Sequence, residues 1–375
     1  MTQLQITFLF LAVVYFLGLL AFLPGLLRGL HRKKTSDFGL QTSDFPNVTI
    51  LICARNEEKN LDLCLESLAK INYPSGLLEI LVVDDCSTDS TAEKLEAWKK
   101  TLPHLKTIST GDFSEAEFSG KVAALIHGMD AARGEFVCIT DADCQVKPDW
   151  VLEHLRWYDA DTGMVSSITV LDSMKPFDAA QSLEMVELLG LSMAAINYGI
   201  PVSVIGNNLS IRKAAYEAIG GYRKIPFSVT EDVALFQTVW NSNTWKVRFK
   251  ANEDLLVSSQ PPGSFRTWWR QKHRWVIGGK DIKIMGKIIL LLGFIGAFIL
   301  IASPFLLPVR YALIAIGIKF LGDLVIIFPA LRGLKQMKLI WFFIAYQLYL
   351  FFFLLSVPVL YMQKDVKWKG RVYHT

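Results

Sequence analysis

Residues 78–89 read L-E-I-L-V-V-D-D-C-S-T-D, and residues 135–143 read E-F-V-C-I-T-D-A-D. In each stretch a run of β-branched and apolar residues, typical of a buried strand, ends in two carboxylates. The carboxylates are Asp84, Asp85, Asp141 and Asp143. Open α/β sheets bind ligands at the carboxyl ends of their parallel strands, so we expect all four at one edge of a sheet.

Strand and helix patterns alternate around these two stretches. Residues 48–54, 78–83 and 135–140 are expected strands. Expected helices cover residues 57–68, 90–100 and 121–132, and a further helix opens at Trp150. Alternation at this pace predicts a mostly parallel sheet with helices on both faces.

The chain is too apolar for an ordinary soluble enzyme, because 52% of its 375 residues are hydrophobic and only 20% are charged. Ile6 to Leu27 contains no charged residue and is long enough to span a bilayer. A cleaved signal peptide is the alternative, but no positive charge precedes this segment. We expect an uncleaved anchor. Basic residues follow it, and by the positive-inside rule they predict that the N-terminus lies outside and that Thr35 onward lies in the cytoplasm. They are Arg28, His31, Arg32, Lys33 and Lys34.

Three more hydrophobic segments follow the α/β region, at residues 288–309, 311–331 and 339–361. Three crossings would leave the C-terminus outside, yet the basic residues of the tail favour the inside. These are Lys364, Lys367, Lys369 and Arg371. Either one segment is re-entrant or interfacial, or the chain is an exception to the rule that basic loops and tails lie on the cytoplasmic side. Within the middle segment, Lys319 and Asp323 lie four residues apart, which indicates a structural intramembrane pair first and a lining of the acceptor path second.

Two further clusters follow the strand-end carboxylates. Glu231 and Asp232 stand in V-T-E-D before an expected helix at residues 233–240. The run Q-K-H-R-W places Gln271, Arg274 and Trp275 at i, i+3 and i+4, so a helix would carry them on one face. Flanking aromatic and basic side chains are expected to form an interfacial belt at head-group depth. They are Arg266, Trp268, Trp269, Arg270 and Lys272.

The order D-D, D-x-D, T-E-D and Q-x-x-R-W, between hydrophobic segments, resembles that of membrane-integrated family 2 glycosyltransferases. The motifs cover about residues 47–280. The resemblance implies a GT-A fold, which is a Rossmann-like α/β domain, here inserted between an N-terminal transmembrane helix and a C-terminal helical membrane region. One departure is Cys86, which stands where the family more often has glycine and puts the loop shape in question.

The resemblance also implies a donor site. It assigns nucleotide-sugar binding to seven residues, which are Arg55, Asn56, Glu57, Asp84, Asp85, Lys121 and Asp141. A helix cap is the alternative for the Asp pair, and a solvated surface lysine is the alternative for Lys121. Asp143, supported by Asp141, would hold Mg²⁺ or Mn²⁺ against the diphosphate, since such ions take one or two carboxylates plus phosphate oxygens.

The acceptor side follows from the same resemblance. Asp232 is assigned as the base that takes the acceptor proton, with Glu231 as its neighbour; a helix N-terminal acid is the alternative. A single base implies inversion. Arg274 would hold the leaving diphosphate, Trp275 would stack on the acceptor, and Gln271 would bond a hydroxyl or a phosphate.

We therefore divide the chain into a transmembrane anchor (1–28), a basic linker (29–46) and a GT-A domain (47–260). An interfacial Q-x-x-R-W region (261–286), about three membrane helices (287–363) and a basic tail (364–375) follow. The expected function is transfer of a sugar from UDP to a lipid at the cytoplasmic face of a bacterial plasma membrane. The alternatives are a processive synthase extending a glycan and a catalytically silent scaffold. The net charge of +4 argues against nucleic acid as a partner and suits the lipid bilayer.

Overall fold

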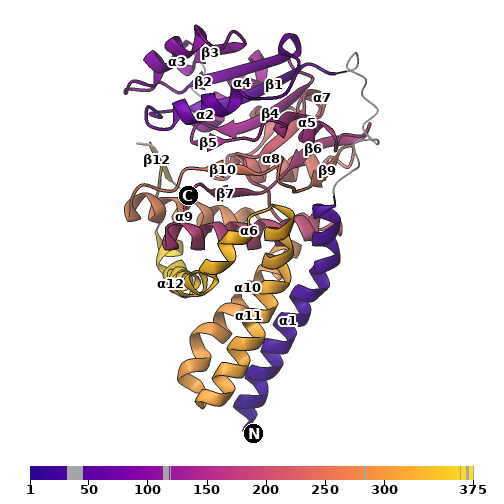
Figure 1. Cartoon of the computed structure of the whole chain (residues 1–375), viewed down its shortest axis with the longest axis vertical. Coiled ribbons are helices and arrows are strands. Elements are labelled where there is room, and N and C mark those ends of the chain that lie inside the picture. The colour runs from indigo at the N-terminus through magenta and orange to yellow at the C-terminus, as the bar shows by residue number, and fades with distance from the viewer. Residues whose placement is uncertain are drawn as a thin grey trace.

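The computed structural model describes residues 1–31, 45–112, 118, 120–282, 284–363, 365–368 and 371–374. An α/β domain forms one end of the molecule, and a bundle of long helices tapers away from it to the other end (Figure 1). Most of the linker, from Arg32 to residue 44, lies outside the described residues, as do Lys364 and Lys369 of the tail.

The main sheet has seven strands in the order β3-β2-β1-β4-β8-β6-β9. Strands β3, β2, β1 and β4 are parallel, as the alternation predicted, and β9 is parallel to β6. Strand β8 runs antiparallel to both of its neighbours, so the sheet is mixed. In sequence order these strands are β1 (Val48–Ala54), β2 (Leu78–Asp84), β3 (Leu105–Ser109), β4 (Phe136–Asp141), β6 (Thr162–Ser166), β8 (Leu209–Arg212) and β9 (Lys246–Phe249).

The central strands are buried on both faces, which explains their uninterrupted apolar sequences. The two-residue period of a strand sends Ile50 and Ile52 into one core cluster and Leu51 into another. Helices cover both faces of this sheet (Figure 1). They are α2 (Leu61–Leu68), α3 (Thr91–Lys99), α4 (Lys121–Ala131), α5 (Trp150–Leu155), α7 (Lys213–Ala218) and α8 (Glu231–Asn241).

A second, three-stranded sheet and several short 3₁₀ helices complete the domain. The sheet has the order β5-β10-β7, with β5 (Cys144–Gln145), β7 (Thr169–Leu171) and β10 (Val257–Ser259). The 3₁₀ helices are η3 (Ser75–Leu77), η4 (Thr110–Asp112), η5 (Tyr222–Lys224) and η6 (Gly279–Asp281).

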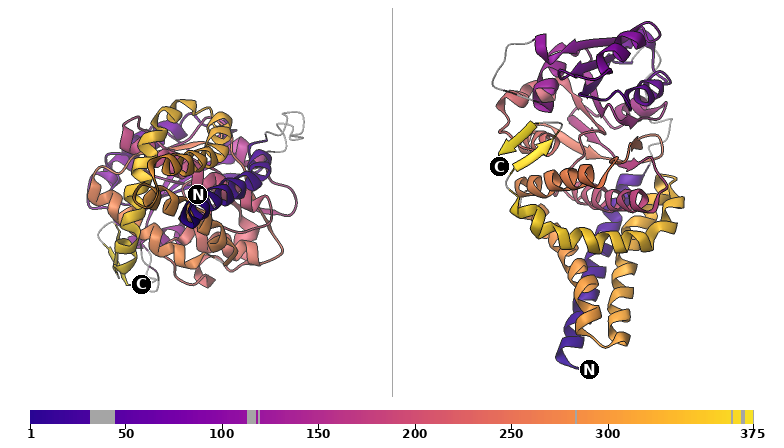
Figure 2. Two further views of the ribbon diagram at one scale, coloured as in Figure 1. Left: turned by 90° about the horizontal axis from the view of Figure 1, so that it is seen from below. Right: turned by 90° about the vertical axis from the view of Figure 1, so that its left-hand side faces the viewer.

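Two helices form a layer between the sheets and the membrane helices. Helices α6 (Pro176–Ile196) and α9 (Phe265–Gly278) lie side by side across the molecule in both side views (Figures 1 and 2). By length and composition α6 could cross a membrane, but 89% of its most apolar window is buried inside the protein. It is therefore a core helix that joins the α/β domain to the bundle.

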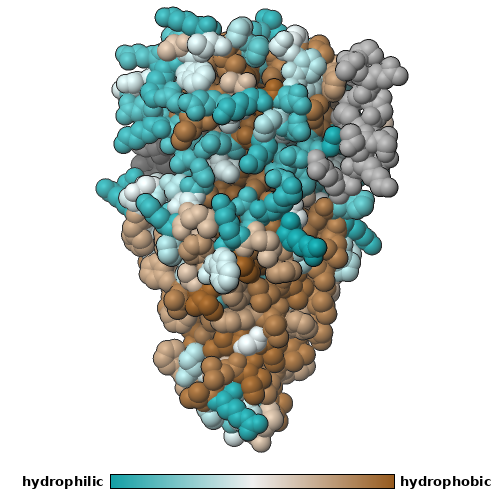
Figure 3. Space-filling model, viewed as in Figure 1, coloured by the Kyte–Doolittle hydropathy of each residue, from teal (hydrophilic) through white to brown (hydrophobic). Residues whose placement is uncertain are grey.

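Three long helices run alongside one another below this layer, namely α1 (Gln3–Leu30), α10 (Ile284–Leu306) and α11 (Val309–Gly333). Helix α12 (Phe343–Met362), which follows η7 (Met337–Phe342), is equally apolar but lies across the other three, against α6 and α9 (Figure 2). The surface is hydrophobic over the tapering half and polar over the α/β domain (Figure 3).

Strands β11 (Asp365–Trp368) and β12 (Arg371–His374) form a terminal hairpin beside α9. The chain end therefore lies on the same side of the long helices as the α/β domain (Figure 2).

The paired charges expected within the bundle are present. Lys319 Nζ lies 2.7 Å from Asp323 Oδ2, and both side chains are buried. Gln347 of α12 bonds both groups, and Tyr15 of α1 donates to Asp323 Oδ1 at 2.6 Å. Because every partner comes from inside the protein, this cluster ties α1, α11 and α12 together, which is the structural role that the sequence predicted.

Candidate active site

The two strand-end carboxylate clusters meet at one edge of the main sheet. Strand β1 lies between β2 and β4, and its register pairs Ala54 with Asp84 and Cys53 with Asp141. The backbone ladder alone therefore brings Asp84 and Asp141 to either side of the end of β1, as expected from the sequence. Arg55 is the next residue of the chain, at the same edge.

The loop after β2 is fixed by its own polar groups. Asp84 Oδ1 accepts from the backbone N–H of Ser87 at 3.1 Å and from its hydroxyl. Asp85 is buried; it accepts from Thr110 Oγ1 at 3.1 Å and lies 3.6 Å from Arg55 Nη1. Cys86 has φ = +53°, the left-handed conformation that glycine adopts most easily. The loop thus has the shape that a glycine would favour, although a cysteine stands there.

The loop after β1 forms hydrogen bonds with the loop after β2. Asn56, also left-handed with φ = +54°, accepts from the Thr88 N–H at 2.8 Å and donates its own N–H to Ser87 Oγ at 3.0 Å. The side chain of Glu57 is buried and accepts from Asn60 at 2.9 Å. Asn56 and Glu57 therefore hold the shape of the edge, while Arg55 and the two Asp residues line it. The turn at residues 57–60 also delays α2, which begins at Leu61 instead of Glu57.

Lys121 connects two of the motifs. It opens α4, only 13% of its side chain is exposed, and its Nζ lies 2.7 Å from Asp141 Oδ1 and 3.1 Å from Glu231 Oε1. Burial alone would lower the pKa of Lys121, but the carboxylates of Asp141 and Glu231 outweigh it and raise this pKa well above its usual value. The lysine is a mostly enclosed cation that pairs with carboxylates of both D-x-D and T-E-D, which excludes the solvated surface lysine considered from the sequence.

Glu231 extends this link to the third motif. Its second carboxylate oxygen lies 3.9 Å from Arg274 Nη1 of α9. Helix α8 begins at Glu231, two residues earlier than expected, so both acids stand in its first turn, where the helix dipole favours negative charge. An alternating chain of charges, Asp141–Lys121–Glu231–Arg274, therefore joins the D-x-D, T-E-D and Q-x-x-R-W motifs, which are far apart in the sequence.

Asp232 faces a different partner. Its Oδ2 accepts from the backbone N–H of Gly206 at 2.6 Å, and its Oδ1 accepts from that of Val233 at 2.9 Å. Burial, followed by the charge of Glu231, raises the pKa of Asp232 to about 6, although Lys121 and Arg274 oppose the shift. A carboxylate with a pKa near 6 is a better proton acceptor than an ordinary aspartate and is still ionised at neutral pH.

From the sequence, residues 206–208 match the family's loop before a short strand near the acceptor, and the structure shows that Gly206 of this loop contacts Asp232. A Cβ at this position would lie 3.0 Å from Asp232 Oδ2 and would press on the acid, so the close contact favours a glycine. Its neighbour Asn208 is a structural residue, since it bonds Trp150, His154 and the carbonyls of Ile168 and Leu255. A Gly-Asn-Asn run before a strand was the available signal, but only the fold reveals which residue meets the acid.

Asp141 and Asp143 are the two carboxylates predicted from the sequence to hold a divalent cation. Asp143 follows the end of β4, is partly exposed, and accepts from Cys144 Sγ at 3.3 Å. Within the described residues, no three His, Cys, Asp or Glu side chains gather as a complete metal site. Two carboxylates at one sheet edge fit an ion that takes its remaining ligands from diphosphate and water, as Mg²⁺ and Mn²⁺ do.

The Q-x-x-R-W helix is less exposed than expected. Gln271, Arg274 and Trp275 are each partly exposed on α9, as the spacing predicted. Trp268 and Lys272, assigned from the sequence to an interfacial belt, are instead buried. That assignment was wrong because α6 and α12 cover this face of α9, and Lys272 pairs there with Glu184 of α6. Arg266 and Arg270 remain exposed.

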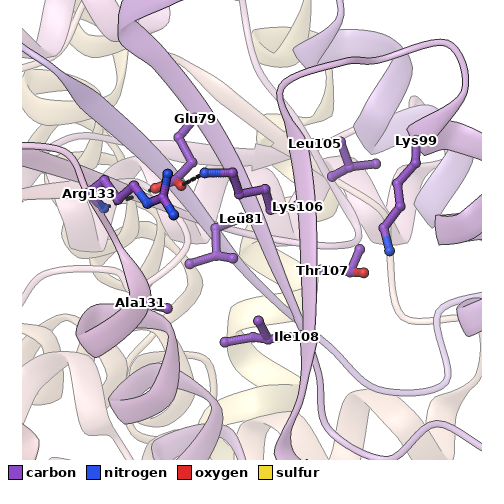
Figure 4. Close-up of a pocket in the computed structure, with 9 residues that line it drawn as sticks. All are labelled: Glu79, Leu81, Lys99, Leu105, Lys106, Thr107, Ile108, Ala131 and Arg133. Carbon is purple, nitrogen blue, oxygen red and sulfur yellow. Dashed lines mark hydrogen bonds and ion pairs between the residues drawn. The ribbon is translucent and has the colours of Figure 1, made fainter.

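A separate pocket lies beside the edge strand β3 (Figure 4). In its wall Glu79 points toward Lys106, whose Nζ lies 2.7 Å from Glu79 Oε1, and Arg133 lines the same pocket. None of the motif residues lines it. We therefore place the candidate active site at the sheet edge and not in this pocket.

Comparison with known proteins agrees with this geometry. Residues 49–220 match the family model described as glycosyl transferase family 2, and residues 136–354 match the model of glycosyl transferase family group 2. The second match covers more than half of the chain and includes the T-E-D and Q-x-x-R-W motifs. The chain belongs to glycosyltransferase family 2, and its apolar helices associate it with membranes.

Relatives and a solved structure extend the comparison. The β-monoglucosyldiacylglycerol synthase of Synechocystis is 25% identical over 64% of this chain and 49% of its own length. The poly-β-1,6-N-acetyl-D-glucosamine synthase of Staphylococcus epidermidis is 22% identical over 63% and 55%, respectively. The chain thus spans about half the length of these relatives. A mannosyltransferase of Pyrobaculum calidifontis, solved with GDP-mannose and Mn²⁺, superposes on this chain with a TM-score of 0.57 and 20% sequence identity. The match covers 95% of this chain and 99% of the mannosyltransferase chain, so the two share a fold.

Proposed function

We propose that this glycosyltransferase is a metal-dependent, inverting enzyme that moves a hexose from UDP to a membrane lipid at the cytoplasmic face of the membrane. The observation that carries the proposal is the charge chain Asp141–Lys121–Glu231–Arg274. It brings the strand-end donor motif into contact with the helix that carries Q-x-x-R-W, so that donor and acceptor would meet between them.

The donor would lie along the sheet edge. Asp84, Asp85 and Arg55 would bond the nucleoside, and Asp141 with Asp143 would hold Mg²⁺ or Mn²⁺. The ion supplies positive charge that offsets the diphosphate as the bond to the sugar breaks. Lys121 and Arg274 would add two further cations, and the planar guanidinium of Arg274 suits a bidentate grip on a phosphate.

Asp232 would act as the base. Its carboxylate takes the proton from the acceptor hydroxyl, whose oxygen forms a bond to the anomeric carbon while the bond from that carbon to the diphosphate oxygen breaks. The Gly206 N–H holds the acid at 2.6 Å, which fixes its orientation before the acceptor arrives. Direct displacement with one base inverts the anomeric centre, so an α-linked donor yields a β-linked product.

We further propose that α1, α10 and α11 cross the membrane and that α12 lies along its surface. Two crossings after the α/β domain return the chain to the cytoplasmic side, where the terminal hairpin lies beside α9. This arrangement removes the conflict between the basic tail and the positive-inside rule. It also places Trp275 in the layer immediately above the membrane helices, within reach of a lipid head group.

A lipid acceptor is favoured over a growing polysaccharide. Side chains fill the described interior of the bundle where α1 meets α11, with Tyr15, Leu19 and Ile326 all buried. The glucolipid synthase among the relatives supports the same choice, and the terminal W-K-G-R-V-Y resembles the tail of lipid glycosyltransferases of the ceramide or hopanoid type. The poly-N-acetylglucosamine synthase among the relatives favours the alternative, a processive synthase.

Product analysis tests the proposal. Purified enzyme in vesicles containing diacylglycerol and native lipid extract would be supplied with UDP- and GDP-sugars and Mg²⁺ or Mn²⁺, and the products examined by mass spectrometry. One sugar on a lipid, β-linked, is the expected result. A long glycan would establish the processive alternative. Absence of nucleotide release with every donor and acceptor would favour a silent scaffold.

A further inference from the structure

Two buried lysine–carboxylate pairs lie within the described residues beneath the α/β domain. Lys319 pairs with Asp323 inside the bundle, and Lys272 of α9 pairs with Glu184 of α6 at 2.5 Å. At most 3% of any of these four side chains is exposed. Such pairs contribute little net stability over a well-packed apolar core, yet removing one partner is costly because the other charge stays buried. A buried pair is therefore a reason to look for a role beyond stability.

The Lys272–Glu184 pair differs from the other in what it touches. Lys272 Nζ lies 4.0 Å from the centre of the Trp275 ring, within the range of a cation–π interaction. On the carboxylate side, Tyr349 of α12 donates to the same Glu184 oxygen as Lys272, at 2.6 Å. A continuous set of contacts thus runs from α12 through α6 to the face of the indole on α9.

Charge balance within this set makes Lys272 depend on Glu184. Burial lowers the pKa of Lys272, and the carboxylate of Glu184 opposes that shift. If Glu184 loses its charge, the lysine loses the group that keeps it ionised, and a neutral amine has no cation–π attraction for the ring. The position of the Trp275 indole would then rest on packing alone.

We propose that the Lys272–Glu184 pair positions the Trp275 ring for the acceptor and so determines how well the enzyme uses its acceptor. Lys272 and Glu184 are positioning residues, since they act through the indole. The inference rests on the proposed function, in which Trp275 contacts the acceptor. Lys272 sits at one of the two unspecified positions of Q-x-x-R-W, so the motif by itself assigns it nothing.

The test compares charge removal at this pair with the same change at the control pair. The variants are Lys272→Met, Glu184→Gln with Lys272→Met, and Lys272→Arg, against Asp323→Asn with Lys319→Met. For each, donor affinity is measured by calorimetry, and kcat and acceptor KM are measured in vesicles. We expect acceptor KM to rise about tenfold in the double variant of the Lys272 pair, with donor affinity unchanged. Lys272→Arg should restore most of the loss because arginine keeps the cation.

The control pair distinguishes positioning from stability. Asp323→Asn with Lys319→Met should change at most the yield or melting temperature of folded protein and should leave acceptor KM unchanged, since Trp275 is not among its contacts. If both double variants change only stability, or if the Lys272 variants weaken the donor and acceptor equally, the inference is wrong. The double variant of the Lys272 pair, which leaves no unpaired charge, keeps the test valid should Lys272→Met fail to fold.

Failure of this inference can be told apart from failure of the proposed function. Trp275→Ala is measured in the same assay. If it raises acceptor KM while the Lys272 variants do not, the acceptor role of Trp275 stands and only the positioning role is lost. If Trp275→Ala leaves acceptor KM unchanged, the assignment of the acceptor to this helix fails first.

Discussion

The two sides of the candidate active site are built by different means. On the donor side, backbone hydrogen bonds between β1, β2 and β4 fix where Asp84 and Asp141 lie. On the acceptor side, side-chain contacts between helices hold the groups, through Glu231 with Arg274 and through Glu184 with Lys272. A strand ladder tolerates most changes of side chain, whereas a side-chain contact disappears with one substitution. Point mutations at the donor edge should therefore remove a chemical group without moving its neighbours. Point mutations at the helices should also shift the positions of the remaining groups.

The largest effect is expected at the donor edge, from Asp143→Asn. The cation loses a charged ligand while the diphosphate keeps its charge, so turnover should fall by at least about 10³-fold and donor affinity should fall with it. Isothermal calorimetry with UDP-sugar, beside a turnover assay, measures both. Chelation of the unmodified enzyme should reproduce the loss, and Asp161→Asn, at an exposed acid paired with Lys246, serves as the control. Activity that survives excess chelator would remove the metal from the mechanism.

Asp232→Asn should separate chemistry from binding. We expect kcat to fall by at least about 10²-fold, the low end of what a positioned base supplies, with donor affinity nearly intact. The measurement is calorimetry together with turnover. If donor affinity collapses in step with the rate, Asp232 belongs to the donor side and the comparison between the two sides fails.

The pH dependence of the rate sharpens the same assignment. Burial raises the pKa of Asp232 to about 6. Below that pH the carboxyl is protonated and cannot accept a proton, so kcat/KM should decrease as the pH falls through about 6 and level off above it. In the Asp232→Asn variant, kcat/KM should not show this decrease below a pH of about 6. A decrease that persists in the variant would assign the titration to another group.

Arg274→Lys and Trp275→Ala, both on α9, should change different kinetic parameters. Lysine keeps the charge but loses the planar fork, so Arg274→Lys should lower kcat by roughly ten- to a hundredfold. Trp275→Ala should raise acceptor KM by roughly tenfold and leave donor KM unchanged. Donor and acceptor are varied separately for each protein, and Trp341→Ala, at a largely exposed residue, is the matched control. If neither variant changes the kinetics, the motif is only an interfacial anchor.

The smallest effect is expected from Gly206→Ala. The added methyl group would meet Asp232 Oδ2 at 3.0 Å and shift the base by a few tenths of an ångström. We expect kcat to fall roughly fivefold, because catalysis is sensitive to small errors of position, while donor affinity and melting temperature stay close to those of the unmodified protein. Gly76→Ala, where the new methyl meets open space, is the control. An unchanged kcat would mean that the Gly206 contact does not orient the base.

Much of the donor side could be read from the sequence because it depends on local pattern. Apolar runs ending in carboxylates predicted β2 and β4 within one residue of their ends, and parallel strands place those ends at one edge. The antiparallel direction of β8 was not predicted, since a strand of four residues gives no signal of direction. The loop after β2 was in question because a cysteine replaces glycine, and only the backbone angle at Cys86 answers that question.

The sequence by itself determined the family, the α/β class, the apolar segments and the candidate chemical groups, because each depends on residue type and spacing along the chain. Tertiary structure decided which groups meet. Lys121 reaches two motifs, Lys272 turns inward to Glu184, and Gly206 contacts Asp232, each across a separation in sequence that no local period encodes. It also placed α12 across the bundle, since its hydrophobicity is the same whether it lies along a membrane or spans one. Residue type determines whether a side chain is stable in water, but packing determines which residue it contacts.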